Sequence, residues 1–154
     1  MNRVLLRNLQ TTDKEAVFDI LQNQEVMCFL GPRRALTNEE ALDWFSAELK
    51  HPSRFAVALK DNGELIGFCG VKRIDGVLDF GYFFRHAFWG NGYATEACEL
   101  VIPLLAREMD LQKLEVFIAK ENKASLAVAS KLGWKRLPET TKNNEQGYYY
   151  RLQR

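Results

Sequence analysis

The sequence predicts a chain of the α/β (α+β) class, with about seven strands and about four helices in a single domain over residues 1–154. Three observations predict this class. Segments with helix-start signals or helical apolar spacing alternate with β-favouring runs, and a glycine-rich turn joins one such run to the longest helix. The chain of 154 residues also has the usual length of one domain.

Two capping boxes start the helices of the first half. Thr12-Asp13-Lys14-Glu15 and Thr37-Asn38-Glu39-Glu40 each place a hydroxyl three residues before a glutamate, so that the two side chains satisfy reciprocal backbone donors. The first box predicts a helix over residues 13–22. The second predicts a helix that ends near Lys50.

The strands of the first half follow from β-favouring runs over residues 4–6, 55–59, 65–71 and 77–84. Asn62-Gly63 separates the second and third runs and is the strongest two-residue hairpin signal, because both positions tolerate positive φ. Asp75-Gly76 provides the next turn. These segments are therefore expected to form consecutive antiparallel strands.

The second half alternates helices and strands. Apolar residues recur at a helical period over residues 93–109, where Pro103 is expected to kink the helix because it removes a main-chain donor. Gly133 suits the cap at the end of a further helix. The remaining elements are a strand over 114–118, that helix over 124–132, a strand from 134, an exposed hairpin loop over 139–146 and a last strand over 148–152.

Charge and cysteine content exclude several classes of protein. Lys plus Arg number 21 against 20 for Asp plus Glu, so the net charge favours neither nucleic acid nor a membrane surface as a partner. Cys28, Cys69 and Cys98 lack the spacing of a zinc site, and no metal is expected. The chain shows no signal-peptide core or membrane-spanning run, which predicts a protein of the reduced cytoplasm.

The run from Trp89 to Ala97 carries the strongest functional signal. A strand that ends in a glycine-rich turn and becomes a helix presents free N–H groups at the positive end of the helix dipole, which favours an anion. Gly90 and Gly92 would let a diphosphate approach the backbone. The alternative is a tight turn with a helix cap. A Walker A loop is excluded because Gly-Lys-Ser/Thr is absent, and Thr95 stands where a dinucleotide fingerprint needs glycine or alanine.

The wider run over residues 81–97, GYFFRHAFWGNGYATEA, resembles motif A of the GNAT superfamily of N-acetyltransferases. It is most similar to the RimJ/RimL-like branch, which acetylates ribosomal-protein amino termini. The resemblance covers nearly the whole chain, from Leu5-Leu6-Arg7 to the segments at residues 122–125 and 131–134. It implies the GNAT acyl-CoA N-acyltransferase fold, with a mixed, mostly antiparallel central sheet of about seven strands flanked by about four helices.

The same resemblance implies acetyl-CoA as cosubstrate and assigns residues to it. The cofactor lies in a cleft between two splayed parallel strands, residues 77–84 and 114–118. The main chain of the first strand pairs with the pantetheine arm, the amides of the turn bind the pyrophosphate, and an asparagine bonds the coenzyme from the next loop. The residues are Tyr82, Phe83 and Phe84 for the strand, Gly90, Asn91, Gly92, Tyr93, Ala94 and Thr95 for the turn, and Asn122 for the loop.

Two residues are expected to take part in catalysis. Many GNAT enzymes protonate the departing thiolate with a tyrosine, but Ala129 occupies that position, and Ser125 matches the serine of the ribosomal-type branch. The alternative for Ser125 is a local helix cap. Asp79 is the candidate general base, with Glu115 as a rival, and the alternative for Asp79 is a strand carboxylate held in an ion pair.

Four other side chains have expected roles. His86 is expected to be a solvated loop residue, and Glu96 a structural or substrate-orienting carboxylate near a helix start. Trp44 and its neighbour Phe45 either line the acceptor pocket or belong to the core.

The expected function is transfer of an acetyl group to a primary amine by direct attack in a ternary complex. The acceptor is a protein amino terminus or a small amine, with amino acids, polyamines and antibiotics all open. The alternative is a noncatalytic acyl-CoA-binding or regulatory module with the same fold. The chain is expected to act as a monomer or a homodimer.

Overall fold

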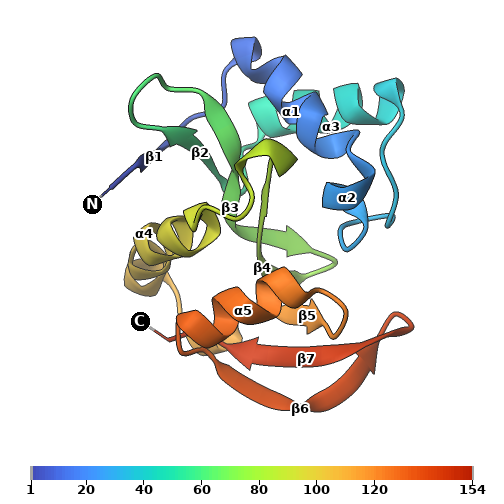
Figure 1. Ribbon diagram of the computed structural model, residues 1–154, viewed down its shortest axis with the longest axis vertical. Coiled ribbons are helices and arrows are strands. Elements are labelled where there is room, and N and C mark those ends of the chain that lie inside the picture. Colours follow the sequence, from blue (N-terminus) through green and yellow to red (C-terminus); the bar gives the residue numbers. More distant parts are fainter. Residues whose placement is uncertain (1, 154) are drawn as a thin grey trace.

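The computed structural model describes residues 2–153, so the first and last residues of the expected domain lie outside the described part. Its helices and strands alternate along the chain much as the apolar patterns predict (Figure 1). The strands are β1 (Val4–Arg7), β2 (Phe55–Leu59), β3 (Leu65–Ile74), β4 (Val77–Phe84), β5 (Phe117–Ala119), β6 (Lys135–Lys142) and β7 (Glu145–Arg151). The α-helices are α1 (Lys14–Leu21), α2 (Gln24–Met27), α3 (Asn38–Lys50), α4 (Tyr93–Glu108) and α5 (Lys123–Lys131).

The seven strands form two sheets rather than one continuous sheet. The first sheet is antiparallel with the order β1-β2-β3-β4, and the second is antiparallel with the order β5-β7-β6. A single parallel bridge between Asp79 of β4 and Glu115 joins them. In this bridge the Glu115 N–H donates to the Leu78 carbonyl, and the Phe80 N–H donates to the Glu115 carbonyl, at 2.8 and 2.9 Å. The two strands expected to splay apart therefore touch at this point and separate beyond it.

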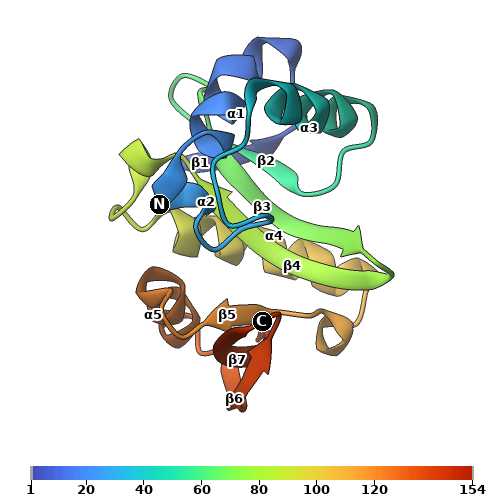
Figure 2. The same ribbon diagram turned by 90° about the vertical axis from the view of Figure 1, so that its right-hand side faces the viewer.

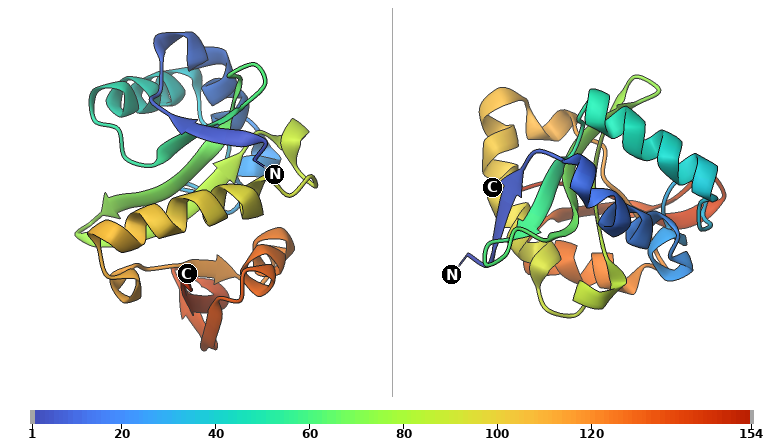
Figure 3. Two further views of the ribbon diagram at one scale, coloured as in Figure 1. Left: turned by 90° about the vertical axis from the view of Figure 1, so that its left-hand side faces the viewer. Right: turned by 90° about the horizontal axis from the view of Figure 1, so that it is seen from above.

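Helices cover the two faces of the first sheet. Helices α1 and α3 pack on one face and α4 runs along the other (Figures 2 and 3). Even-numbered residues of β4, such as Phe80 and Phe84, join the core under α4, whereas Phe83 packs against the core under α1 and α3. The second sheet lies below β4, with α5 beside it (Figure 2).

The two capping boxes start helices near the expected positions, but not with the same contacts. Thr37 Oγ1 accepts from the Glu40 N–H, and the Glu40 carboxylate accepts from the Thr37 N–H, as predicted. At the first helix, the carboxylate of Asp13 instead accepts from the Gln10 N–H. Residues Thr11–Asp13 form a short 3₁₀ helix before α1. The expected hydroxyl cap at Thr12 was wrong, although α1 itself was predicted correctly.

Two other expectations about secondary structure were only partly right, and one helix was missed. The hairpin expected over 139–146 is present, but its loop is shorter, because β6 continues to Lys142 and a two-residue turn at Asn143-Asn144 leads into β7. Both asparagines have positive φ, 49° and 68°, a conformation that asparagine tolerates. The strand expected over 114–118 is regular only at β5, and Glu115 pairs through the isolated bridge. Helix α2 was not predicted.

Pro103 does not end the helix in which it lies. Helix α4 runs unbroken from Tyr93 to Glu108, and Pro103 is exposed on its surface. The missing proline N–H therefore faces the solvent side of the helix rather than the core.

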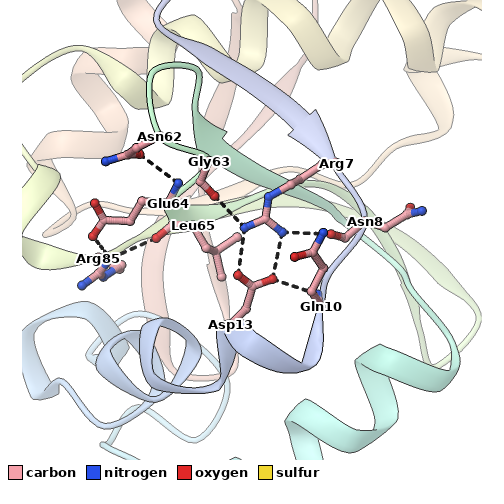
Figure 4. A network of polar contacts seen from close by, with 9 residues as sticks. All are labelled: Arg7, Asn8, Gln10, Asp13, Asn62, Gly63, Glu64, Leu65 and Arg85. Carbon is pink, nitrogen blue, oxygen red and sulfur yellow. Dashed lines mark hydrogen bonds and ion pairs between the residues drawn. The ribbon is translucent and has the colours of Figure 1, made fainter.

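A polar network fixes the first strand to the first helix and to the β2–β3 turn (Figure 4). The Arg7 guanidinium donates to both carboxylate oxygens of Asp13 at 2.8 Å and to the Gly63 carbonyl at 2.9 Å. On the other side of that turn, Arg85 donates to Glu64 at 2.8 Å and to the Leu65 carbonyl at 3.0 Å. These contacts hold the end of β4, where the glycine-rich turn begins, against the N-terminal half.

Candidate functional site

A cavity of about 600 Å³ opens where β4 and the second sheet separate. Its walls come from the end of β4, the turn and first residues of α4, the start of α5, and the segment from α2 onward. The lining residues are Glu25, Val26, Cys28, Phe29, Leu30, Tyr82, Phe83, Phe84, Phe88, Trp89, Gly90, Gly92, Tyr93, Ala94, Thr95, Asn122, Lys123, Ala124, Ser125 and Val128. Of the residues predicted to bind the coenzyme, all but Asn91 line this cavity.

The glycine-rich turn presents unpaired donors to the cavity. Gly92 is the N-cap of α4 with φ 82°, and Gly90 has φ 77°. Among residues 2–153, none accepts a main-chain hydrogen bond from the N–H groups of residues 90–95. A Cβ built on Gly90 would meet no atom within 4 Å, so open space stands in front of the turn. Free amides, a helix N-terminus and open space fit an anion such as a diphosphate.

Side chains of the same motif hold the turn in shape. The Trp89 indole N–H donates to the Phe84 carbonyl at 3.0 Å, and the Asn91 side-chain amide donates to the Trp89 carbonyl at 3.0 Å. The His86 ring packs on Trp89 with centroids 4.7 Å apart, and its Nε2 lies 2.8 Å from a Glu25 carboxylate oxygen. Asn91 therefore supports the turn, and the half-exposed His86 links the turn to α2.

Glu96 ties the turn to the first strand. Its carboxylate accepts from the N–H groups of Arg3 and Val4 at 2.5 and 3.2 Å and from the Arg3 guanidinium at 2.8 Å. Burial raises the pKa of Glu96, but the Arg3 hydrogen bonds outweigh it and leave that pKa lowered. Of the two expected roles, the contacts of Glu96 are structural.

The edge of β4 that faces the cavity has free main-chain groups. Phe80 bonds Glu115 across the gap between the sheets, and main-chain direction alternates along a strand, so the N–H and C=O of Tyr82 point to the same side. Beyond Glu115 no strand of the second sheet pairs with this edge within residues 2–153. An extended ligand with an amide chain, such as a pantetheine arm, fits this edge by strand-like pairing.

A hydroxyl pair crosses the cavity floor. The Tyr82 hydroxyl lies 3.0 Å from Ser125 Oγ, joining β4 to the first turn of α5. Burial raises the pKa of the Tyr82 phenol, more than its bond to Ser125 lowers it, so Tyr82 keeps its proton over the neutral range. The Asn122 side-chain oxygen accepts from the Ser125 N–H at 3.3 Å and caps the helix. Asn122, rather than Ser125, is therefore the local cap.

Position 129 faces away from the cavity. Ala129 is fully buried among core residues of α4 and the sheets, while its neighbour Val128 lines the cavity. In this chain the hydroxyl that α5 offers to the cavity is that of Ser125.

Asp79 lies outside the cavity lining. Its carboxylate accepts a 2.7 Å hydrogen bond from Arg54 and stands next to Glu115 across the parallel bridge. Burial raises the pKa of Asp79 most strongly, Glu115 adds to that increase, and Arg54 and Lys142 oppose it. The ion pair matches the structural alternative for Asp79, and its catalytic role stays a prediction.

Neither aromatic residue of α3 is among the residues that line the cavity, and both pack with the core under α1 and α3. Phe45 is buried in this core. Trp44 is partly buried and packs edge-on against Phe83, which lines the cavity, with centroids 6.2 Å apart.

Two parts of this region were missed from the sequence. The wall formed by residues 25–30 carries no recognisable motif, and only the short helix α2 brings it to the cavity. Arg54 follows Ser53 in a segment without periodicity, and its partner Asp79 is 25 positions away. Only the topology brings these residues together.

Comparisons with known proteins agree with this geometry. The family described as acetyltransferase (GNAT) domain matches residues 3–135. The uncharacterized protein YkkB of Bacillus subtilis is 30% identical over 142 residues, which cover 86% of this chain and 81% of YkkB.

Solved structures show the same fold. A GNAT-family acetyltransferase from Bacillus anthracis superimposes with a TM-score of 0.83 at 26% identity, over 97% of this chain and 93% of the other. YncA of Salmonella typhimurium, solved with its cofactor acetyl-CoA, has the same fold, with a TM-score of 0.69 at 16% identity over 99% of this chain and 94% of YncA. The chain belongs to the GNAT family of acetyltransferases.

Proposed function

We propose that this protein transfers the acetyl group of acetyl-CoA to a primary amine by direct attack in a ternary complex. One observation carries the proposal. The unpaired amides of residues 90–95, the free edge at Tyr82 and the hydroxyl of Ser125 all border one cavity. These groups are, in that order, an anion site, a site for an amide chain and a proton donor.

The chain's own residues hold the donor in place. The amides from Gly90 to Thr95 bind the diphosphate, with Gly92 allowing its close approach. The edge of β4 at Tyr82, Phe83 and Phe84 pairs with the pantetheine arm, and the Asn122 side-chain NH₂ donates from the start of α5. Bound acetyl-CoA supplies an acetyl group activated as a thioester.

Ser125 passes a proton to the coenzyme sulfur on release, and its oxygen then regains a proton from solvent in the open cavity. Because Ser125 Oγ accepts from the protonated Tyr82 hydroxyl, its own hydrogen is free to point into the cavity. The positive end of α5 lies at the same place and stabilises developing negative charge. Tyr82 acts through Ser125 and is a positioning residue.

Asp79 takes up the proton of the attacking amine. A pKa raised by burial brings this carboxyl closer to the range in which a general base works. The Arg54 guanidinium acts against that increase and favours the ionised carboxylate. Glu115, adjacent across the bridge, is the alternative base.

The acceptor class includes protein amino termini, on the RimJ/RimL-like resemblance, and small primary amines.

Cys69 and Cys98 support a reducing compartment, because their sulfurs lie 4.0 Å apart as free thiols in the core. Among the described residues, no helix is long and apolar enough to cross a membrane.

The test measures thiol release from acetyl-CoA over a panel of amines and N-terminal peptides, with coenzyme affinity measured in parallel by calorimetry. Acceptor-dependent release supports acetyl transfer. Intact coenzyme binding without release from any acceptor would instead identify a noncatalytic acyl-CoA-binding module.

A further inference from the structure

An arginine lies flat against β4 on the face opposite the Tyr82 side chain. Arg54 precedes β2 and exposes only 10% of its side chain. Its guanidinium rests over Gly81, where a Cβ would come within 3.3 Å of Nη2 and 3.5 Å of Nε. Gly70 pairs with Gly81 on the next strand, and a Cβ there would come 3.3 Å from the Arg54 Cα. Gly81 therefore leaves the space in which the guanidinium lies, and Gly70 leaves the space for the main chain of Arg54.

Most hydrogen-bond donors of Arg54 have no acceptor. Nη2 donates to Asp79 at 2.7 Å, but Nε is buried without a partner among residues 2–153, and Nη1 makes no hydrogen bond within that range. A guanidinium carries five N–H donors in a fork that matches a carboxylate, and unpaired buried donors are costly. The Arg54 guanidinium is therefore fixed in place by one ion pair, and most of its N–H groups remain available to an acceptor.

Arg54 lies close to one wall of the cavity. The side chains of Phe80 and Phe84 on one face of β4 pack in the core with α4. On the opposite face Phe83 borders the cavity, and the Arg54 guanidinium carbon lies 5.8 Å from the centre of its ring. Gly81, covered by Arg54, immediately precedes Tyr82. Arg54 and Asp79 are therefore next to the expected end of the pantetheine arm.

The charges on this face are balanced. Each of three carboxylates has one cation within 3.1 Å, and both carboxylates at the bridge are 23–28% exposed at the side chain. The pairs are Glu48–Lys72, Asp79–Arg54 and Glu115–Lys142. Because the charges cancel, this surface does not attract a polycation. It does place a carboxylate, which can bind an amine, next to a guanidinium, which can bind an anion.

We propose that Arg54 binds the carboxylate of the acceptor, so that the acceptor is a small amino acid rather than a protein amino terminus. The inference rests on the proposed acetyl transfer and names its substrate class. Asp79 and Arg54 touch, so the amine and the carboxylate of the acceptor must also be close together, as in α- or β-amino acids. A peptide amino terminus has an uncharged carbonyl at that place.

The experiment compares amino acids with their carboxamides as acceptors. KM and kcat are measured by thiol release, and binding to the coenzyme A-loaded protein is measured by calorimetry, for the native protein and for Arg54→Lys. Lysine keeps the charge that Asp79 needs but lacks the planar fork. An amino acid and its carboxamide differ in amine basicity. This difference cancels when the KM of each acceptor is compared between the native protein and the variant.

We expect Arg54→Lys to raise KM for an amino acid about tenfold to a hundredfold, with a much smaller effect on kcat and on KM for the carboxamide. Gly81→Ala should act in the same direction, because its methyl group would displace the guanidinium. Arg73→Met, an exposed arginine at the end of β3, is the matched control and should leave both KM values unchanged.

The outcomes separate this inference from the proposed function. Thiol release with equal KM for amino acids and carboxamides, or equal losses for both in Arg54→Lys, would overturn the role of Arg54 alone. Amino acids that bind in an Arg54-dependent manner without any thiol release would support Arg54 and contradict acetyl transfer. Circular dichroism and thermal melting of each variant show that it is folded.

Discussion

The Tyr82 hydroxyl donates to Ser125 Oγ over 3.0 Å and joins the strand proposed to bind the pantetheine arm to the helix proposed to offer a proton. Burial raises the pKa of Tyr82, so the phenol keeps the proton that it donates in this bond. Ser125 receives this bond at Oγ and is held at its N–H by Asn122. The pair therefore fixes both where the serine oxygen lies and which way its hydrogen can point.

Ser125→Ala is expected to lower kcat about a hundredfold and to leave coenzyme affinity nearly unchanged, because the lost group acts on the departing sulfur. Tyr82→Phe should lower kcat less, since it removes only the orientation of Ser125. The double variant should be no slower than Ser125→Ala. Steady-state kinetics with coenzyme calorimetry check this prediction. Equal loss in Ser125→Ala and Ser130→Ala, an exposed serine late in α5, would show that the effect is one of stability.

Gly92→Asp is expected to weaken coenzyme binding by at least about tenfold. The change forces an L side chain into φ 82° and places a carboxylate where the diphosphate is proposed to bind. Gly76→Asp is the matched control, because Gly76 has nearly the same φ of 80° but lies in the β3–β4 turn, away from the cavity. If both variants, or neither, lose affinity in calorimetry, the turn at Gly92 is not the diphosphate site.

Much of the fold could be predicted because its signals are local. Capping residues, the glycines at 90 and 92, and helical apolar spacing each act within a few residues, and α1, α3, α4 and α5 were found close to their observed bounds. The hairpin expected over 139–146 was confirmed, but its loop was predicted too long because a run of polar residues hid the ends of β6 and β7. The pair Asn143-Asn144, with Thr140 and Thr141 before it, was the available signal.

The division into two sheets could not be predicted from local signals. It depends on an isolated parallel bridge between Asp79 and Glu115, which are 36 positions apart in the sequence. The same limit applies to the site. Gly90 to Thr95 belong to one short motif, whereas Arg54 meets Asp79, and Tyr82 meets Ser125, only after the chain has folded.

Asp13→Asn is expected to destabilise the protein by about 2–3 kcal/mol at neutral pH. Asp13 is buried, yet its hydrogen bonds from Arg7 and the Gln10 N–H outweigh that burial and lower its pKa below the ordinary 3.8. A lowered pKa in the folded state stabilises the protein above the ordinary value, and this contribution disappears as the pH falls through the folded-state pKa.

Urea unfolding of the native protein and of Asp13→Asn at several pH values checks this. The gap between their free energies of unfolding should be largest near neutrality and should shrink at acidic pH. Asp61→Asn, in the exposed β2–β3 turn, serves as the control and should track the native protein. A gap that stays constant as the pH falls would mean that Asp13 does not stabilise the protein through its charge.

The Arg33–Glu145 ion pair offers a separate test of how the acceptor side is closed. Arg33 has φ 65° and donates to both Glu145 oxygens at 3.0 and 2.7 Å, which ties the chain between α2 and α3 to the start of β7. The same connecting segment supplies Phe29 and Leu30 to the cavity. Glu145→Gln should raise the acceptor KM about threefold with little change in melting temperature, because exposed ion pairs contribute little to stability.

Salt should reproduce this effect in the native protein. Rising ionic strength screens the exposed Arg33–Glu145 pair, so the acceptor KM of the native protein should approach that of Glu145→Gln, whose own KM should change less. Glu139→Gln removes a comparable pair, to Lys120 at 3.4 Å, on the neighbouring strand and should behave as the native protein does. If Glu139→Gln raises KM as much as Glu145→Gln does, the effect comes from the overall charge of the hairpin. It would then not come from the ion pair between the α2–α3 segment and β7.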